Sequence, residues 1–307
     1  MTATLSRAST EVSGQLACLA NFIAARTTGD EDRATNINSL AFFRREQNTE
    51  PCACLVEPSV VLVAQGAKQM LVGGQRYPYD PSHFLLTSVD LPASSQVLDA
   101  SPHQPCLGLV LRLDLHIMAE LIAQGGITPP AAGGALHGMA LGTVTPSLLD
   151  AFCRLLSLLD DTADQPVLEP LILREIHYRL LMSEQASRLW QILAAGTHGQ
   201  RIARAIDWLK SHYSEPLRID ELAARVQMSA SSLHHHFRQM TAMSPLQYVK
   251  WLRLNEARRL MLNEKMEAAT AAFRVGYESP SQFSREYGRL FGQPPKRDIA
   301  LLVQAGR

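Results

Sequence analysis

Two stretches near the carboxyl end of the chain repeat one spacing of apolar and polar residues. Ser229 and Ser279 stand fifty positions apart, and each is followed four positions later by a large apolar residue, Leu233 or Phe283. Further matches come eight and sixteen positions after each serine: Phe237 and Tyr287, then Pro245 and Pro295. Positions four apart lie on one face of a helix, and serine is a favoured N-cap. The pattern therefore predicts one helical unit that is used twice.

A short apolar segment precedes each of these two helices. Residues 222–226 and 269–275 are predicted helices, and Gly276 provides a turn position that tolerates a left-handed backbone, whereas Gln227 takes that place in the first unit. Short helix, turn and second helix are the order of a helix-turn-helix motif. With one face of each second helix buried, the other positions form a donor-rich surface suited to base edges and phosphates. The residues expected there are Ser231, Ser232, His234, His235 and Arg238, then Ser281, Gln282, Ser284 and Arg285.

Before residue 200 the pattern changes to short apolar runs divided by Gly, Pro and Asp. Strands are predicted at residues 40–44, 59–64, 68–72, 83–87, 107–113 and 139–144, with a hairpin turn at Gly73-Gly74. Because no helix-length segment separates the first five, the pattern favours a small barrel or a double-sheet jelly roll over a βαβ arrangement. Helices are expected at residues 16–23, 114–124, 146–159 and 168–183, an irregular stretch from 24 to 32, and a loop at 128–134.

The predicted fold class is thus α+β with two domains. Residues 1–195 hold a small β-barrel or jelly roll (about 35–145) with flanking helices (about 146–193), and residues 200–307 form an all-α double helix-turn-helix domain. The small-residue segment 193–199 is expected to be the hinge between them.

Charge divides the chain at the same place. The whole sequence holds 29 basic and 29 acidic residues. Residues 200–307 hold 17 Lys and Arg against 10 Asp and Glu, a net charge of +7, which leaves −7 for residues 1–199. A basic domain attracts phosphate groups by releasing counterions, so the carboxyl-terminal domain is expected to bind double-stranded DNA.

The composition also excludes several classes of protein. No stretch approaches the roughly eighteen uninterrupted apolar residues of a membrane-spanning helix, and the first twenty residues lack the pattern of a signal peptide, so a cytoplasmic protein is expected. Five cysteines in such a chain suggest reduced thiols. Nucleophile elbow, Walker loop and dinucleotide fingerprint are absent from the sequence, so neither catalysis nor a cofactor is expected.

The carboxyl-terminal region resembles a known family. Residues 274–287 read RVGYESPSQFSREY and are followed by Leu290-Phe291-Gly292 and Pro294-Pro295. Through these motifs residues 200–297, about a third of the chain, are similar to the DNA-binding domain of the AraC/XylS family of bacterial transcription regulators. The resemblance implies seven helices in two helix-turn-helix halves joined by one long helix, which is expected here at residues 245–263.

The amino-terminal region carries a second resemblance. Gln65-Gly66 followed by Lys68, the run FLLTSVDLP at residues 84–92 and the run PCLGL at 105–109 are similar to the cupin-like N-terminal domain of the YqhC-like AraC subgroup. This implies an effector-sensing domain, with a dimer contact on the helices after the barrel. The chain is therefore predicted to be a homodimeric, sequence-specific transcription regulator controlled by an unknown small molecule, with RNA polymerase as a further partner. Activation is the expected mode, although the sequence does not separate an activator from a repressor.

Individual roles follow for the polar faces of the two second helices. Arg285 is expected to read a base directly, with Gln282 and Ser281 beside it, whereas Arg238 is expected to contact phosphate. Consecutive helical residues diverge by about 100°, so the run His234-His235-His236 does not converge on one metal ion. His236, next to Phe237, is expected to pack against the core.

The cysteines leave a second hypothesis open, in which the regulator senses oxidants or electrophiles through a thiol. Cys106 is the first candidate, followed by Cys52 and Cys54, which share one face if that segment is extended. Ordinary buried cysteines are the alternative. No metal site is expected around His83 and His103, because the H-x-H spacing of a cupin metal site is absent.

Two alternatives come from other classes of protein. In one, the barrel is an enzyme and the helical domain only tethers it, although the sequence offers no paired acid and base. In the other, the basic domain contacts RNA polymerase without reading DNA.

Overall fold

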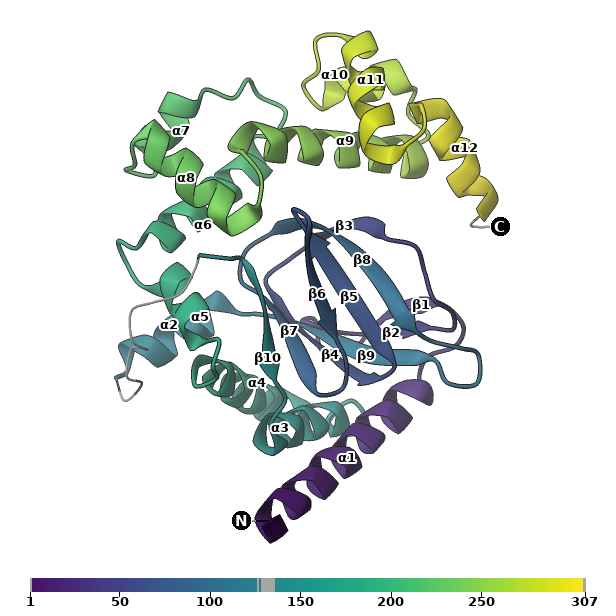
Figure 1. The fold of residues 1–307 in the computed structure, drawn as a ribbon, viewed down its shortest axis with the longest axis vertical. Helices are drawn as coiled ribbons and strands as arrows, with labels where there is room; N and C mark the ends of the chain where they lie inside the picture. Colours follow the sequence, from purple (N-terminus) through teal and green to yellow (C-terminus); the bar gives the residue numbers. More distant parts are fainter. Residues whose placement is uncertain (1, 126, 128–135, 306–307) are drawn as a thin grey trace. The chain divides into compact units, whose positions relative to one another are not determined.

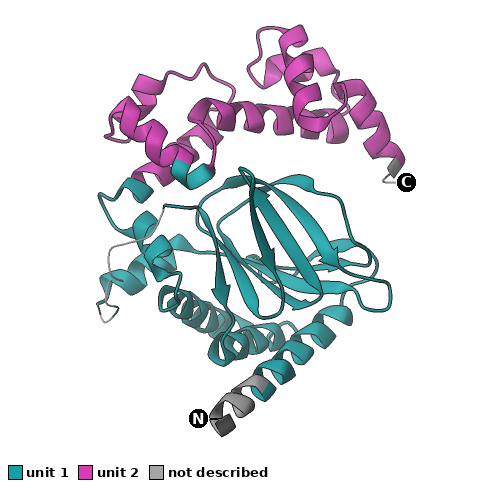
Figure 2. Cartoon of the chain, viewed as in Figure 1, with its two compact units in different colours: residues 1–200, 239–241 teal, residues 201–238, 242–307 magenta. Residues whose placement is uncertain are grey.

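The computed structural model describes residues 2–125, 127 and 136–305, with side chains from residue 10 onward. The chain divides into two compact units, residues 1–200 with 239–241 and residues 201–238 with 242–307 (Figure 2). The loop predicted at residues 128–134 lies outside the described residues.

The first unit consists of two antiparallel sheets with helices on one side (Figure 1). One sheet has the order β1-β2-β9-β4-β7-β10 and the other the order β3-β8-β5-β6. The strands are β1 (Glu31–Ala34), β2 (Leu40–Arg45), β3 (Cys52–Val56), β4 (Ser59–Gln65), β5 (Ala67–Val72), β6 (Gln75–Tyr79), β7 (His83–Thr87), β8 (Leu91–Asp99), β9 (Cys106–Arg112) and β10 (Met139–Thr143). The helices are α1 (Thr2–Ala24), α2 (Leu115–Ala123), α3 (Pro146–Ser157), α4 (Gln165–Leu181) and α5 (Ala186–Leu193).

These elements confirm the predicted α+β class. Of the two predicted forms, barrel and double-sheet jelly roll, the structure has the double sheet, because the two sheets do not close into one barrel. The hairpin at Gly73-Gly74 is confirmed: both glycines have positive φ, 54° and 85°, and Val72 pairs with Gln75 across the two-residue turn.

Several expectations about the first unit were wrong in extent. The first helix runs from Thr2 to Ala24, far longer than residues 16–23, and the stretch expected to be irregular through Asp32 enters strand β1 at Glu31. Strands β3, β6 and β8 were missed. β6 and β8 each contain a proline, and β3 and β8 each contain a single β-branched residue and no aromatic one, which weakens the signal on which strand prediction rests. Helix α5, just before the expected hinge, was also missed.

Alternation along the strands of the six-stranded sheet separates its two faces. Phe42 on β2, Leu62 on β4 and Leu109 on β9 belong to a buried cluster that includes Phe152 and Leu155 of α3. Helices α1, α3 and α4 therefore cover this face, and each fully buried side chain there contributes about 1.5–3 kcal/mol through removal from water. The next residues along the same strands, Phe43, Val61 and Val110, line a cavity that the four-stranded sheet closes from the other side.

The second unit consists of helices joined by turns, with no strand among its described residues (Figure 1). Its helices are α6 (His198–Ser211), α7 (Ile219–Arg225), α8 (Ala230–Thr241), α9 (Pro245–Asn263), α10 (Ala268–Arg274), α11 (Pro280–Phe291) and α12 (Pro295–Ala305). The first residues of α6 and the last turn of α8 are grouped with the first unit. These seven helices, with α7–α8 and α10–α11 as the two motifs and α9 between them, confirm the expected arrangement.

Helix α9 begins with a capping box. The Ser244 side chain accepts a hydrogen bond from the Gln247 backbone N–H, and the Gln247 side chain accepts one from the Ser244 backbone N–H, with Pro245 in the first turn. From the middle of this helix Arg253 donates to the backbone oxygens of Tyr213, at 2.6 Å, and Gly276, at 3.0 Å. One guanidinium thus joins α9 to segments from both helix-turn-helix halves.

Candidate nucleic-acid interface and internal cavity

Helix α8 presents the first polar face predicted from sequence. Its N-cap is Ser229, whose hydroxyl accepts from the Ser232 backbone N–H at 3.2 Å, and Leu233 and Phe237 are completely buried. Burial of that face leaves Ser231, His234, His235 and Arg238 exposed and Ser232 half-buried at the cap. The Arg238 guanidinium has no ionic partner in the part of the chain that the structure describes, so it is available to an external anion.

Helix α11 presents the second face by the same construction. Ser279 accepts from the Gln282 backbone N–H at 3.3 Å, while Phe283 and Tyr287 are completely buried. Ser281, Gln282, Ser284 and Arg285 are all exposed. The side-chain amide of Gln282 donates to Glu286 at 3.2 Å, an internal partner that sequence reasoning did not foresee. Among the described residues Arg285 has no ionic partner.

His236 differs from its two histidine neighbours. It is half-buried, and its ring meets that of His235 edge-on at 5.0 Å between centroids. The packing role expected for His236 stays a prediction. Among the residues that the structure describes, no group of three or more His, Cys, Asp or Glu side chains is placed to share a metal ion.

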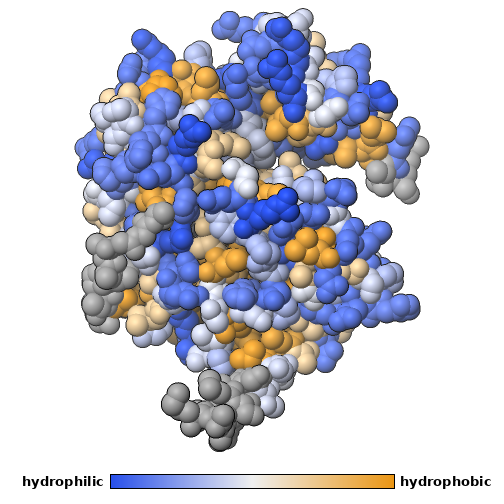
Figure 3. Space-filling model, viewed as in Figure 1, coloured by the Kyte–Doolittle hydropathy of each residue, from blue (hydrophilic) through white to orange (hydrophobic). Residues whose placement is uncertain are grey.

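Polar contacts hold α11 against α9. Glu286 accepts hydrogen bonds from Lys250 and Tyr277, both at 2.8 Å. Burial opposes ionisation of Glu286, but the donors around it outweigh burial and lower its pKa, so it is a carboxylate at neutral pH. Deeper in the same half, Asp298 accepts from Tyr287 at 2.6 Å and from Arg258 at 2.7 and 2.8 Å. Hydrophilic residues cover much of the visible face of this unit, with smaller hydrophobic groups between them (Figure 3).

The largest candidate site in the first unit is the cavity between its two sheets. Its volume is about 830 Å³, within the range of small-molecule sites. Apolar walls come from both sheets: Phe43, Val61, Leu85 and Val110 on one side, Met70, Tyr79 and Val97 on the other. Charged residues also line it: Asp32, Arg45, Glu57, Lys68 and Arg112.

Sequence reasoning missed the role of Lys68 in this cavity. The signal was present, because Lys68, Met70 and Val72 alternate along β5 and share one face, and Met70 and Val72 are buried. A lysine that alternates with buried apolar residues along a strand points inward. Such a lysine either protects a sheet edge from pairing or contributes to a binding site.

The candidate sensing cysteines are placed differently from one another. Cys52 and Cys54 lie on β3 and both line the cavity, which confirms that they share a face. Cys106 is completely buried and is not among the lining residues. Burial raises the pKa of Cys54 and of Cys106 to about 11, so both are protonated at neutral pH, the opposite of an activated thiolate. Thiol sensing stays a prediction that the surroundings of these two thiols do not favour.

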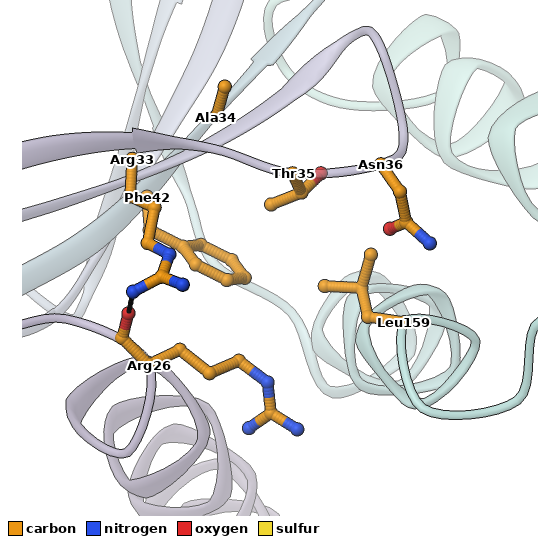
Figure 4. Close-up of a pocket in the computed structure, with 7 residues that line it drawn as sticks. All are labelled: Arg26, Arg33, Ala34, Thr35, Asn36, Phe42 and Leu159. Carbon is orange, nitrogen blue, oxygen red and sulfur yellow. Dashed lines mark hydrogen bonds between the residues drawn. The ribbon is translucent and has the colours of Figure 1, made fainter.

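A smaller hollow of about 260 Å³ lies where α1, the first two strands and the end of α3 meet (Figure 4). Two arginines line it. Arg26 binds both carboxylate oxygens of Asp160, at 2.5 and 2.6 Å, and Arg33 donates to the backbone oxygen of Arg26 at 2.6 Å. Because both guanidinium groups already have acceptors within the protein, the two arginines stabilise the packing of these segments and do not form an anion site.

Two helix-turn-helix motifs on a shared long helix, in one chain with an antiparallel double-sheet domain, define the class of two-domain helix-turn-helix regulators. Residues 36–188 match the model of the AraC-type transcriptional regulator N-terminus, and residues 222–298 match that of a helix-turn-helix domain. The chain belongs to the AraC-type transcriptional regulators, a family of regulators and not of enzymes.

Relatives agree with this assignment, and a solved structure shares the fold. The chain is 28% identical over 141 residues to the transcriptional activator RhaS of Pectobacterium carotovorum, covering 46% of this chain and 50% of RhaS. It is 31% identical over 124 residues to the regulator CdhR of Pseudomonas aeruginosa, covering 40% and 37%. The chain thus spans half or less of the length of these two relatives. ToxT of Vibrio cholerae bound to an unsaturated fatty acid has a similar fold, with a TM-score of 0.55, 11% identity, and coverage of 85% of this chain and 94% of ToxT.

Among the described residues no helix is both long enough and apolar enough to cross a bilayer.

Proposed function

We propose that this protein is a cytoplasmic regulator of transcription that reads DNA sequence through α8 and α11 and responds to a small molecule bound between its two sheets. The observation that carries the first part is the pair of exposed polar helix faces. Each helix is held by two buried aromatic or aliphatic side chains, and Arg238 and Arg285 on these faces have no ionic partner among the described residues. Two such helices on one unit suit successive turns of the major groove.

The roles of the two arginines differ in this proposal. Arg285 stands beside Ser281 and Gln282 on the exposed face of α11 and would pair with a base edge, most suitably guanine O6 and N7. Arg238 lies in the last turn of α8, two turns from the N-cap, and would contact phosphate. Because Gln282 already donates to Glu286, its side chain would read a base only by exchanging that bond.

The effector part rests on the cavity of about 830 Å³ between the sheets. ToxT, whose fold this chain shares at low sequence identity, has been crystallised with a fatty acid, so a small amphipathic molecule is compatible with the fold. The effector would act by binding one arrangement of the protein more tightly than another, without chemical change. RhaS is an activator, and activation through contact with RNA polymerase is the corresponding proposal here.

An exposed apolar stripe on α4 supports a homodimer. Val167, Leu171, Tyr178 and Met182 follow helical spacing along one face and are 66%, 59%, 42% and 55% exposed. Exposed apolar side chains in a row are typical of an interface. Sedimentation of Leu171→Glu beside the native protein tests this: the variant is expected to sediment as a monomer at a concentration where the native protein is a dimer.

The experiment that tests DNA reading is a selection from random DNA with the purified full-length protein, followed by Kd measurements at one stated salt concentration. Arg285→Ala is expected to lose about 1–3 kcal/mol on the selected site and little on random DNA. Arg238→Ala is expected to weaken both DNAs similarly, because a phosphate contact carries no sequence information.

Arg259→Ala is the matched control. This arginine of α9 is already paired with Glu256 at 2.8 Å and Glu264 at 3.1 Å, so its removal changes the net charge by the same amount without removing a free guanidinium. Both affinities should stay close to those of the native protein. A selection that enriches no sequence would refute the proposal, and equal losses on both DNAs for Arg285→Ala would refute its base-reading role.

A further inference from the structure

The charges that line the internal cavity do not cancel. Arg45 binds Asp32 at 2.7 Å, and Arg112 lies 3.8 Å from Glu57. Both carboxylates are more than half exposed, 70% and 53%, so these two pairs belong to the rim of the cavity. The remaining charged lining residue, Lys68, forms no ion pair with any residue that the structure describes. With Lys68 protonated, the lining holds three cations against two anions, one positive charge more than negative.

That charge lies between the two sheets. Lys68 belongs to β5 of the four-stranded sheet, and its Nζ lies 4.1 Å from the ring centroid of Phe43, a buried residue of β2 in the six-stranded sheet. Burial lowers the pKa of Lys68 most strongly; the Cys106 thiol, Asp32 and Cys54 oppose this effect, and the nearby Arg45 adds to it. An aromatic face stabilises an ammonium less than a carboxylate does, so a bound carboxylate would favour the charged form of Lys68.

A second donor stands next to the lysine. Tyr79 on β6 is the direct cross-strand partner of Lys68, it lines the same cavity, and it is 3% exposed. Its hydroxyl has no hydrogen-bond partner among the described residues. Burial raises the pKa of Tyr79, so the phenol keeps its proton and can donate it to an acceptor.

The protein's own thiols do not neutralise the lysine. Cys54 shares the cavity, but burial raises its pKa to about 11, which leaves it uncharged at neutral pH. A ligand with a single negative charge would supply the partner for a protonated Lys68 that the described lining residues do not supply. A dianion such as a phosphate monoester would leave a negative charge without a partner in an apolar chamber.

We propose that Lys68 and the hydroxyl of Tyr79 bind the carboxylate of a singly charged organic acid whose apolar body fills the space between Phe43, Val61, Met70 and Val110. This assignment rests on the proposed sensing role of the cavity and names the chemical class of the effector. The carboxylate replaces water and the Phe43 ring as the partner of the ammonium, and the phenol supplies a second hydrogen bond.

The test compares acids with their own primary amides, which have the same apolar body and no charge. Decanoate, 4-phenylbutyrate and 1-naphthylacetate are titrated into the full-length protein by calorimetry, each beside its amide. At least one acid is expected to bind about tenfold or more tightly than its amide, as expected for a buried charge-assisted hydrogen bond. The proposal is overturned if no acid in this set binds more tightly than its amide.

Three variants test whether Lys68 causes the preference for an acid over its amide. Lys68→Met is expected to bring the acid-to-amide affinity ratio close to one, whereas Lys68→Arg keeps the charge and is expected to keep most of the ratio. Arg76→Met is the control, because it removes an exposed cation from the neighbouring strand β6, outside the cavity lining. An acid preference that survives Lys68→Met, or that disappears in Arg76→Met, contradicts the assignment.

A ligand-free measurement tests the uncompensated charge independently. Lys68→Met replaces an unpaired ammonium by an apolar chain of similar length, so the melting temperature of the ligand-free protein is expected to rise. A fall would mean that the charge is already compensated and would overturn the proposal. Specific DNA binding, measured on the same preparations, separates the two proposals. If specific DNA binding persists while Lys68→Met leaves the acid-to-amide affinity ratio unchanged, only the carboxylate assignment fails.

Discussion

The two helix-turn-helix halves have the same order of helices and turns, but they use different residues at matching positions. In both halves the turn before the second helix contains a residue with a left-handed backbone, Gln227 with φ 58° and Gly276 with φ 88°. In both halves the second helix also ends at a left-handed residue, Ala242 with φ 58° and Gly292 with φ 75°. The first half thus uses residues with a Cβ at both places where the second uses glycine.

Close approach of the backbone explains one of these glycines. A Cβ on Gly276 would lie 2.1 Å from the backbone oxygen of Ser214, whereas a Cβ on Gly292 would have nothing within 4 Å. A left-handed backbone is therefore tolerated by other residues at a modest cost, and only crowding makes glycine necessary.

The cores of the two halves differ in polarity at matching positions. Phe237 in the first half packs edge-on against Tyr248, with ring centroids 5.5 Å apart. Tyr287, its counterpart, adds a hydroxyl that donates to Asp298, which also binds Arg258. A buried carboxylate with several donors is costly to disturb, because loss of one member leaves the others without partners.

The largest expected effect comes from removing that carboxylate. Asp298→Ala removes the carboxylate that accepts from Arg258 and from the Tyr287 hydroxyl and is expected to lower the free energy of unfolding by about 3–5 kcal/mol. Urea unfolding of the full-length protein, followed by tryptophan fluorescence, measures it. Asp220→Ala, an exposed carboxylate of α7 in the first half, should cost less than about 0.5 kcal/mol. Equal losses of unfolding free energy in the two variants would mean that the cluster of Asp298, Tyr287 and Arg258 does not make the second half differ from the first.

Gly276→Ala is expected to have the next largest effect. The left-handed backbone and the short contact with Ser214 together should cost at least about 2 kcal/mol. Gly292→Ala shares the left-handed φ but lacks the contact, so about 1 kcal/mol is expected for it in the same urea experiment. The explanation by crowding fails if the two substitutions cost the same.

The smallest expected effect is a gain in the first half. Gln227→Gly relieves a left-handed φ at an exposed residue, while the added flexibility of the unfolded chain offsets part of the benefit, so about 0.5 kcal/mol of stabilisation is expected. The Gln227 backbone oxygen, which accepts from Arg201 at 2.8 Å, is unchanged by the substitution. Differential scanning calorimetry should show a small rise in melting temperature, and a clear fall would show that the side chain itself stabilises the turn.

The sequence by itself determined the repeated helical unit and its outward faces. Ser229 and Ser279 cap their helices, and the residues four and eight positions later are buried, because capping and helical periodicity act over one or two turns. Local signals of this kind also placed the strands with apolar runs and the Gly73-Gly74 hairpin.

Only the tertiary structure decided which distant residues meet. Asp298 reaches Tyr287 and Arg258 through the packing of three helices, and the strand register sets Lys68 opposite Tyr79 and beneath Phe43 of the other sheet. No local pattern contains these contacts, because strand order and helix packing arise from burial of whole faces and not from neighbouring residues. The cavity, and the position of Lys68 in its lining, depend on both sheets.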